Sequence, residues 1–170
     1  MIVLGLDPAI RTTGYGVLRA DSVSQLSVLD CGVITNGKTL PHTECLRRLY
    51  GGISELVGAF APDCAVLEEP FVGRNSKTAI ILGMARGAIV AAAAEAGVAC
   101  FAYSPRSAKR AAVGSGSAPK EQVASLLAAL FGLSVENIPL DATDAISLAL
   151  CHQQMIAHGD VLAASLAKRI

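Results

Sequence analysis

The stretch MIVLGLDPAIRTTGYG, from Met1 to Gly16, decides how the rest of the chain is arranged. Its first part, Ile2 to Leu6, is a short apolar run rich in β-forming residues, and the turn signal Asp7-Pro8 ends it, so the pattern predicts a buried strand. A carboxylate at the end of a buried strand lies where a rigid element opens onto a crevice, which is a common position for a functional group. Asp7 could also do no more than cap a turn, and this stretch taken alone favours that simpler interpretation.

The size and composition of the chain indicate one domain with an aliphatic core. Its 170 residues are enough to bury roughly 70% of the surface that the unfolded chain exposes. Hydrophobic residues make up 52% of the chain, aromatic residues 4% and charged residues 16%. So low a charged fraction suggests that part of the apolar surface is covered by a partner, such as a second copy of the chain. We therefore expect residues 1–170 to form a single domain that assembles as a homodimer.

The sequence contains no sign of a targeting segment, a membrane span or a cysteine metal site. Met1 leads directly into the first strand, and the longest apolar stretch, Gly87 to Ala94, is much shorter than the ~20 residues that span a bilayer. The five cysteines are scattered and never form a CxxC pair, which is typical of reduced, mostly buried thiols. These features predict a soluble, cytoplasmic protein with no membrane partner.

The charged residues are unevenly distributed along the chain, although the total charge is neutral. The formal net charge is zero, which alone argues against a nucleic acid as the partner. Between Pro70 and Lys120, however, seven basic residues stand against the single acid Glu95, so this segment has a net charge of +6 and the rest of the chain −6. Its basic residues are Arg74, Lys77, Arg86, Arg106, Lys109, Arg110 and Lys120. Such a distribution is expected where an anionic polymer is held beside an acidic cluster, although a solvated helix face could account for part of it.

The order of the predicted elements indicates an α/β fold. The predicted strands are Ile2–Leu6, Gly14–Leu18, Leu26–Thr35, Asp63–Leu67 and Val98–Tyr103. The predicted helices are Pro41–Phe60, Asn75–Glu95, a short turn after Ser104-Pro105, Ala118–Phe131 and Pro139–His158. Short separators predict an antiparallel meander for the first three strands, and a crossover helix makes the fourth strand parallel to an earlier one. The helix Asn75–Glu95 is apolar nearly all round, which predicts burial on most sides. The whole pattern predicts one five-stranded mixed sheet flanked by helices.

The strongest chemical signal lies at the start of the last predicted helix. The sequence Asp141-Ala142-Thr143-Asp144 puts two carboxylates three residues apart, so both project from one face of the first turns. They could simply cap the helix, because acidic residues favour a helix N-terminus. The mostly apolar residues that follow predict a buried helix, however, and two acids on a buried face need a counter-charge such as a divalent metal ion.

Four acids from three distant segments are expected to meet at one edge of the sheet. If the fourth strand lies parallel beside the first, Asp7 and Glu68 emerge at adjacent carboxyl ends, where Asp141 and Asp144 can join them. Left bare, these carboxylates would raise one another's pKa values. Two Mg²⁺ or Mn²⁺ ions roughly 4 Å apart would relieve the repulsion and support in-line hydrolysis of a phosphodiester. His152 lies roughly 12 Å beyond Asp144 along the helix axis, so we expect it to be a satisfied histidine and not a ligand.

These residues lead to a known family. The pattern resembles the RuvC-type Holliday junction resolvases, whose fold is ribonuclease H-like. The matching stretches are LGLDPAIRTTGYGV, LEEPFVGRN, LGMARG, AVGSGSAPKEQV and LDATDAISLALCH, which run from near the start of the chain to about His152. The resemblance implies that Asp7, Glu68, Asp141 and Asp144 are the catalytic metal ligands.

The resemblance also implies residues that contact DNA. Phe71 looks like the aromatic side chain that such enzymes place at the junction centre, and Lys109 and Lys120 match basic residues near the scissile phosphate. The basic segment, including Arg74 and Lys77, is expected to hold further phosphates. Phe71 could instead fill a surface hollow, and the lysines could be solvated. One departure is Ala9, where the family usually has glycine, and a positive φ at this position would strain the loop.

The resemblance therefore predicts a homodimeric, Mg²⁺-dependent endodeoxyribonuclease that cuts four-way DNA junctions by paired symmetric incisions in recombination and repair. Branch-migration motor proteins are candidate partners. The nearest alternative is another ribonuclease H-like nuclease, such as a YqgF-type RNA-processing enzyme. A non-enzymatic junction-binding module would not need the four acids. An actin-like ATPase or kinase would need a second nucleotide-binding half, for which 170 residues leave no room.

Overall fold

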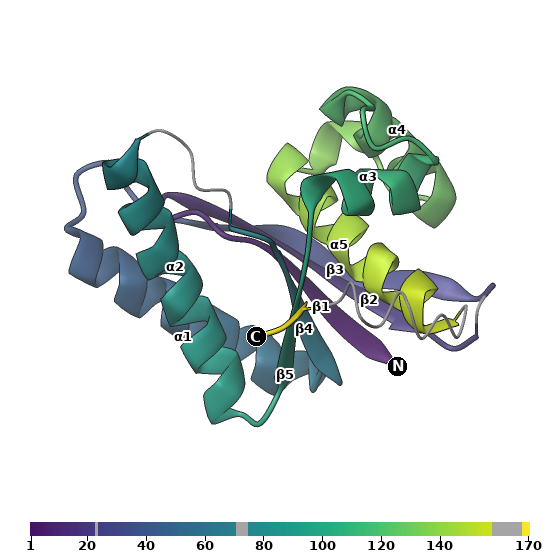
Figure 1. Cartoon of the computed structure of the whole chain (residues 1–170). Helices are drawn as coiled ribbons and strands as arrows, with labels where there is room; N and C mark the ends of the chain where they lie inside the picture. Colours follow the sequence, from purple (N-terminus) through teal and green to yellow (C-terminus); the bar gives the residue numbers. More distant parts are fainter. Residues whose placement is uncertain (23, 71–74, 158–167) are drawn as a thin grey trace.

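A six-stranded mixed sheet forms the centre of the computed structural model (Figure 1), which describes residues 1–22, 24–70, 75–157 and 168–170. Its strands are β1 (Ile2–Asp7), β2 (Thr12–Ala20), β3 (Leu26–Thr35), β4 (Cys64–Glu68), β5 (Ala99–Tyr103) and β6 (Lys168–Arg169), in the spatial order β3-β2-β1-β4-β5-β6. The first three strands are antiparallel, while β4 runs parallel to β1 and β5 parallel to β4. The predicted five-stranded mixed sheet is therefore confirmed. The additional strand β6 is two residues long and pairs with β5.

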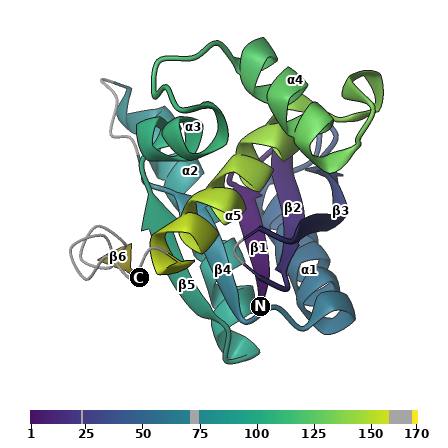
Figure 2. The same ribbon diagram turned by 90° about the vertical axis from the view of Figure 1, so that its right-hand side faces the viewer.

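Helices cover both faces of the sheet. They are α1 (His42–Phe60), α2 (Ser76–Glu95), α3 (Pro105–Val113), α4 (Lys120–Phe131) and α5 (Leu140–Ala157), with a short 3₁₀ turn, η1 (Val135–Asn137), before α5. Figure 1 shows α1 and α2 on one face of the sheet and α3, α4 and α5 on the other. In Figure 2, α5 lies directly across the central strands, with α3 and α4 further out. The five cysteines are free thiols, and four of them are buried, as the sequence predicted.

Alternation along the strands separates the two layers of the core. On β1, Leu4 and Leu6 pack toward α1 and α2, whereas Val3 packs toward α5. On β4, Leu67 faces the α1–α2 layer and Val66 faces α5. Since side chains alternate with a period of two along a strand, the next residues, Asp7 and Glu68, fall on the α5 side.

Glycines allow α5 to pack directly on the backbone of β1 and β2. A Cβ on Gly5 would lie 1.9 Å from the carbonyl oxygen of Ala145, and one on Gly14 would lie 2.0 Å from that of Asp141. Neither position has room for any side chain. The glycines that the sequence places in the first two strands therefore fix how closely the start of α5 approaches the end of β1.

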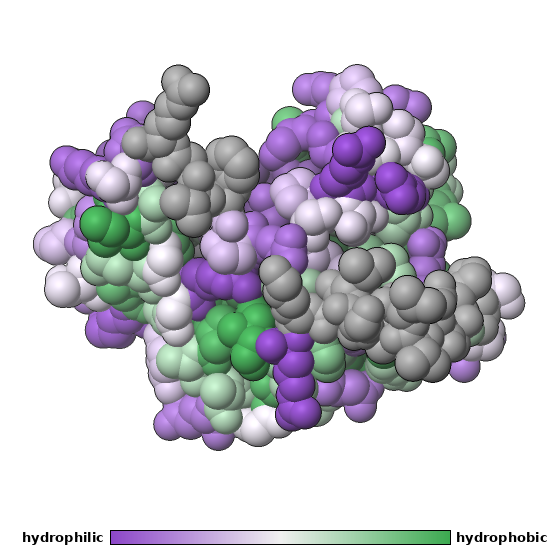
Figure 3. Space-filling model, viewed as in Figure 1, coloured by the Kyte–Doolittle hydropathy of each residue, from purple (hydrophilic) through white to green (hydrophobic). Residues whose placement is uncertain are grey.

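The prediction that α2 is buried on most sides is wrong for the described chain. Its buried residues are Ala85, Ile89, Ala92 and Ala93, whereas Ile80 is 64% exposed and Leu82 and Met84 are also exposed. Figure 3 shows a hydrophobic patch over α2 at the left of the molecule. By length and composition α2 is the one described helix that could cross a membrane, and 22% of its most apolar window is buried. An apolar composition alone predicts that a helix is covered, but it does not specify whether the same chain or a second copy covers it.

Candidate active site

Two neighbouring strands present the first two acids of the site. β1 and β4 pair in parallel with Leu6 opposite Leu67, so the residues that follow, Asp7 and Glu68, stand side by side at the carboxyl ends. Both lie on the face covered by α5, as the alternation described above requires. The expected adjacency of these two acids is therefore present in the structure.

The first turns of α5 bring the other two acids to the same place. Carboxylate oxygens of Asp7, Asp141 and Asp144 all lie within 4.8 Å of one another, a spacing at which they could share a metal ion. Glu68 stands beside this group and lines a hollow of about 180 Å³ together with Asp144. The structure thus brings together the four acids predicted from three distant segments, and their roles as metal ligands stay a prediction.

The electrostatics of the group indicate a deficit of positive charge. The pKa of Asp7 is raised from 3.8 to about 7, first by burial and then by the charges of Glu68, Asp144 and Asp141, while Lys120 opposes the rise. The pKa of Glu68 is also raised, first by burial and then by Asp144. A cluster of hard oxygen donors whose charges repel one another matches the preference of Mg²⁺ and Mn²⁺, so the residues fit a divalent ion of this class.

Two lysines from the covering helices line the same hollow. Lys120, at the start of α4, forms an ion pair with Asp144. Lys109, on α3, donates from its Nζ to the carbonyl oxygen of Ala118 at 2.9 Å, so it fixes the segment that leads into α4. The sequence suggested that both lysines are remote from acids, because only Glu95 shares their segment. Folding changes this for Lys120, which faces acids that are distant in sequence.

Arg86, which the sequence indicated only as one member of the basic segment, lies next to the site. It is half-buried on α2 and its guanidinium donates to the carbonyl oxygen of Glu68. On the other side of the same segment, the backbone N–H of Glu69 donates to the carbonyl oxygen of Tyr103 at 2.8 Å. The end of β4 is therefore held from α2 and from β5. A basic residue within an apolar helix was the available signal, since a half-buried guanidinium needs an acceptor.

The loop after β1 forms without strain at Ala9. Among the described residues other than glycine, only Ala61 has a positive φ, so Ala9 does not need the conformation that would favour glycine. The hydroxyl of Thr13 donates to the carbonyl oxygen of Ala9 at 2.6 Å and closes the loop. The substitution of alanine for the usual glycine thus leaves Asp7 in a regular position.

The structure does not test the roles of the other three residues that were predicted to contact DNA. Phe71 and Arg74 lie outside the described residues. Lys77 is exposed in the first turn of α2 and does not line the hollow between the acids and Lys109. The roles predicted for these three residues stay predictions.

His152 is satisfied within the core and takes no part in the acidic cluster. Its Nδ1 lies 2.9 Å from the hydroxyl of Tyr103, and its ring packs on Phe101 with centroids 4.6 Å apart. Burial lowers its pKa to about 4, so the imidazole is neutral near pH 7. This confirms the prediction of a buried, partnered histidine.

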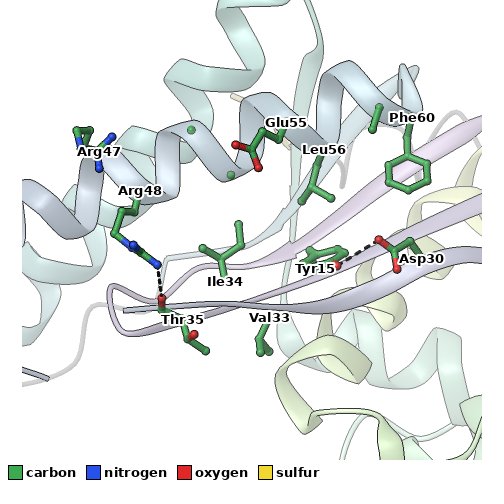
Figure 4. Close-up of a pocket in the computed structure, with 13 residues that line it drawn as sticks. Tyr15, Asp30, Val33, Ile34, Thr35, Arg47, Arg48, Glu55, Leu56 and Phe60 are labelled. Atoms are coloured by element: carbon green, nitrogen blue, oxygen red, sulfur yellow. Dashed lines mark hydrogen bonds between the residues drawn. The ribbon is translucent and has the colours of Figure 1, made fainter. Parts of the chain in front are cut away.

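A larger hollow lies on the other face of the sheet, away from the acids. Figure 4 shows this groove, of about 820 Å³, between α1 and the strands β2 and β3. Its charged groups are partly paired within the chain: Tyr15 donates to Asp30 at 3.2 Å, and Arg48 donates to Asn36 at 3.0 Å. No carboxylate of the acidic cluster lines it. The volume of a hollow, taken alone, would therefore point to this groove and not to the acidic cluster.

Comparison with known proteins agrees with this geometry. The family model described as crossover junction endodeoxyribonuclease RuvC matches residues 3–152. The crossover junction endodeoxyribonuclease RuvC of Chlorobaculum parvum is 45% identical over 151 residues, covering 89% of this chain and 80% of the relative. That of Marinobacter nauticus is 42% identical over 154 residues, covering 91% and 86%.

A solved structure extends the likeness to the whole fold. Thermus thermophilus RuvC in complex with a Holliday junction substrate superposes with a TM-score of 0.88 at 32% identity, covering 100% of this chain and 99% of that one. The match supports the predicted ribonuclease H-like fold class.

Proposed function

Because this chain belongs to the RuvC family of crossover junction endodeoxyribonucleases, we propose that it resolves four-way (Holliday) DNA junctions by phosphodiester hydrolysis at its cluster of four acids. In this proposal residues 1–170 act as one ribonuclease H-like nuclease domain in the cytoplasm, in recombination and repair, and branch-migration motor proteins are candidate partners.

One observation carries the proposal for the site. Asp7, Asp141 and Asp144 come from opposite ends of the chain, yet their carboxylate oxygens lie within 4.8 Å of one another, with Glu68 alongside. Burying acids together costs folding free energy, as the raised pKa of Asp7 indicates. Four acids kept together in spite of this cost are expected to serve a function that needs their negative charge, such as binding a metal ion.

We infer that these four carboxylates hold Mg²⁺, with two ions per site and Mn²⁺ as a possible substitute. The ligand atoms would be the carboxylate oxygens of Asp7, Glu68, Asp141 and Asp144. When bound, such ions activate water and neutralise charge on the leaving oxygen. The protein contributes rigid placement: β1 and β4 are central strands, and the glycines under α5 fix the distance of its two acids from them.

Cationic residues around the acids suit a phosphate backbone. Lys109 and Lys120 line the hollow beside Glu68 and Asp144, where a scissile phosphate could meet both positive charge and the acids. Arg74 and Lys77 would add phosphate contacts that do not depend on base sequence. Phe71 would unstack bases at the branch point at a cost of a few kcal/mol, offset by new contacts.

We further propose that α2 forms the interface of a homodimer. Its exposed Ile80, Leu82 and Met84 are the kind of apolar patch that a second copy covers. Gly83 and Gly87 have open space around them, so a second helix could approach closely there. A two-fold dimer presents two identical acidic sites, which matches paired symmetric incisions in a four-way junction.

Cleavage assays with matched substrates test the function. The purified protein is incubated in Mg²⁺ with a synthetic four-way junction, a duplex of the same arm sequence and a single-stranded RNA, and each reaction is repeated in EDTA. We expect symmetric cuts in the junction only, and only with metal. Preferential cutting of the RNA would favour a YqgF-type processing enzyme, whereas tight junction binding without cutting would favour a binding module.

A further inference from the structure

The position of Lys120 is not explained by the helix that carries it. Lys120 is the first residue of α4, and Pro119, which precedes the helix, provides no side-chain hydrogen bond to its free N–H groups. A cation at a helix N-terminus is unfavourable, because the backbone dipoles already leave partial positive charge there. The helix dipole therefore does not favour a lysine at this place, although Glu121 in the same turn partly offsets it.

Lys120 faces the acidic cluster across the hollow. The ammonium of Lys120 forms an ion pair with Asp144, whose side chain is 15% exposed, while the lysine side chain is 49% exposed. Asp144 is one of three acids, with Asp7 and Asp141, whose carboxylate oxygens lie close enough to one another to share one metal ion.

A metal ion bound by Asp144 would therefore need the same carboxylate that the ammonium of Lys120 now contacts. We infer that Lys120 is the internal counter-ion of the metal-free site, and that a divalent ion must displace its ammonium from Asp144 in order to bind. This inference rests on the proposed function, which assigns the cluster to metal. The lysine is well suited to such an exchange, because its half-exposed stem can swing the ammonium out toward a DNA phosphate once a metal neutralises the acids.

Metal titration without DNA provides the first test. Mg²⁺ is titrated calorimetrically, at low ionic strength, into the parent protein, Lys120→Met and Lys109→Met. Methionine keeps the length of the side chain but removes the charge. We expect Lys120→Met to bind Mg²⁺ roughly two- to fivefold more tightly than the parent, because a partly exposed ion pair no longer competes. Lys109→Met is the matched control, since it removes a charge from the same hollow but from a side chain that is bound to the Ala118 carbonyl.

Thermal unfolding provides a second readout that does not depend on activity. In EDTA, Lys120→Met should unfold at a lower temperature than the parent, because its acids lack a counter-charge. Saturating Mg²⁺ should close this gap, since the variant gains more from the ion that it binds more tightly. Lys120→Arg, which keeps the charge, should restore the stability of the metal-free protein.

The outcomes separate this inference from the function on which it rests. Equal or weaker Mg²⁺ binding by Lys120→Met would overturn the inference and leave the lysine as a phosphate ligand, with the metal site intact. A gap in unfolding temperature that is the same with and without Mg²⁺ would also overturn it. If no variant binds Mg²⁺ at all, the metal assignment itself fails along with the inference.

Discussion

At the scale of single residues, Asp7 bears the largest electrostatic cost of the site. Its pKa is raised from 3.8 to about 7, so the folded protein holds the proton more tightly than the unfolded chain does. The contribution of Asp7 to the free energy of unfolding is therefore greatest below about pH 4 and falls as the pH rises, until it levels off above about pH 7. The total loss is at most about 4 kcal/mol.

This decrease of stability with rising pH can be tested on the metal-free protein. In EDTA, the stability of the parent should fall as the pH is raised from about 4 to about 7, whereas that of Asp7→Asn should fall much less. Urea unfolding at a series of pH values measures both. Parallel curves for the two proteins would mean that Asp7 is not desolvated in the folded state.

Replacing each acid by its amide separates binding from cutting. Asp7→Asn, Glu68→Gln, Asp141→Asn and Asp144→Asn keep the shape of the side chain but remove a metal-binding charge. We expect each to lower the cleavage rate by about two orders of magnitude or more, because each ~1.4 kcal/mol of lost stabilisation is tenfold in rate. Junction affinity, measured by fluorescence anisotropy, should persist or increase.

The acid next to the cluster provides the control for these variants. Glu69→Gln changes the residue that follows Glu68 and should remain active, because the family position falls on Glu68. An Asp144→Asn variant that cuts junctions at the parental rate in Mg²⁺ would reduce the pair on α5 to a helix cap.

At the scale of elements, the site depends on how closely α5 lies against β1 and β2. Gly14→Ala would place a Cβ 2.0 Å from the backbone carbonyl of Asp141, so the start of α5 would have to move. We expect a loss of about 2–3 kcal/mol in stability and weaker Mg²⁺ binding, measured by urea unfolding and calorimetry.

A second glycine provides the contrasting case. Gly51 lies within α1 and would have nothing within 4 Å of an added Cβ. Gly51→Ala should therefore stabilise the protein by about 0.5–1 kcal/mol and leave metal binding unchanged. If Gly14→Ala were as well tolerated as Gly51→Ala, the close packing of α5 would not be needed for the site.

The elements also show what the sequence could and could not predict. Strands such as Leu26–Thr35 were placed correctly because hydrophobic patterning and turn residues mark their ends, and the parallel pairing of β1 and β4 was enough to bring Asp7 and Glu68 together. The contact between Lys120 and Asp144 depends on how α4 and α5 pack, which no local pattern specifies. Likewise, the apolar surface of α2 could not be assigned, because a composition suited to a core helix is equally suited to an interface between two copies.

At the scale of the whole molecule, the exposed surface of α2 leads to a prediction about assembly. Ile80→Glu introduces a charge at the centre of the proposed interface and should shift the protein to monomers, as measured by sedimentation equilibrium. The acidic site of each monomer should still bind Mg²⁺, whereas paired cutting of a junction should be lost. Leu130→Glu, on α4, is the matched control, since Leu130 is 60% exposed and Ile80 64%. A dimer that survives Ile80→Glu would place the interface elsewhere.

The separation of the acids along the chain has a consequence for the living cell. Asp7, on β1, and Glu68, on β4, leave the ribosome well before Asp141 and Asp144, which lie on α5 and follow much later in the sequence. A growing or prematurely terminated chain therefore carries half of the cluster and cannot assemble the site, even though its strands can begin to fold as they emerge. The four acids can therefore come together only after the segment that contains α5 has been made.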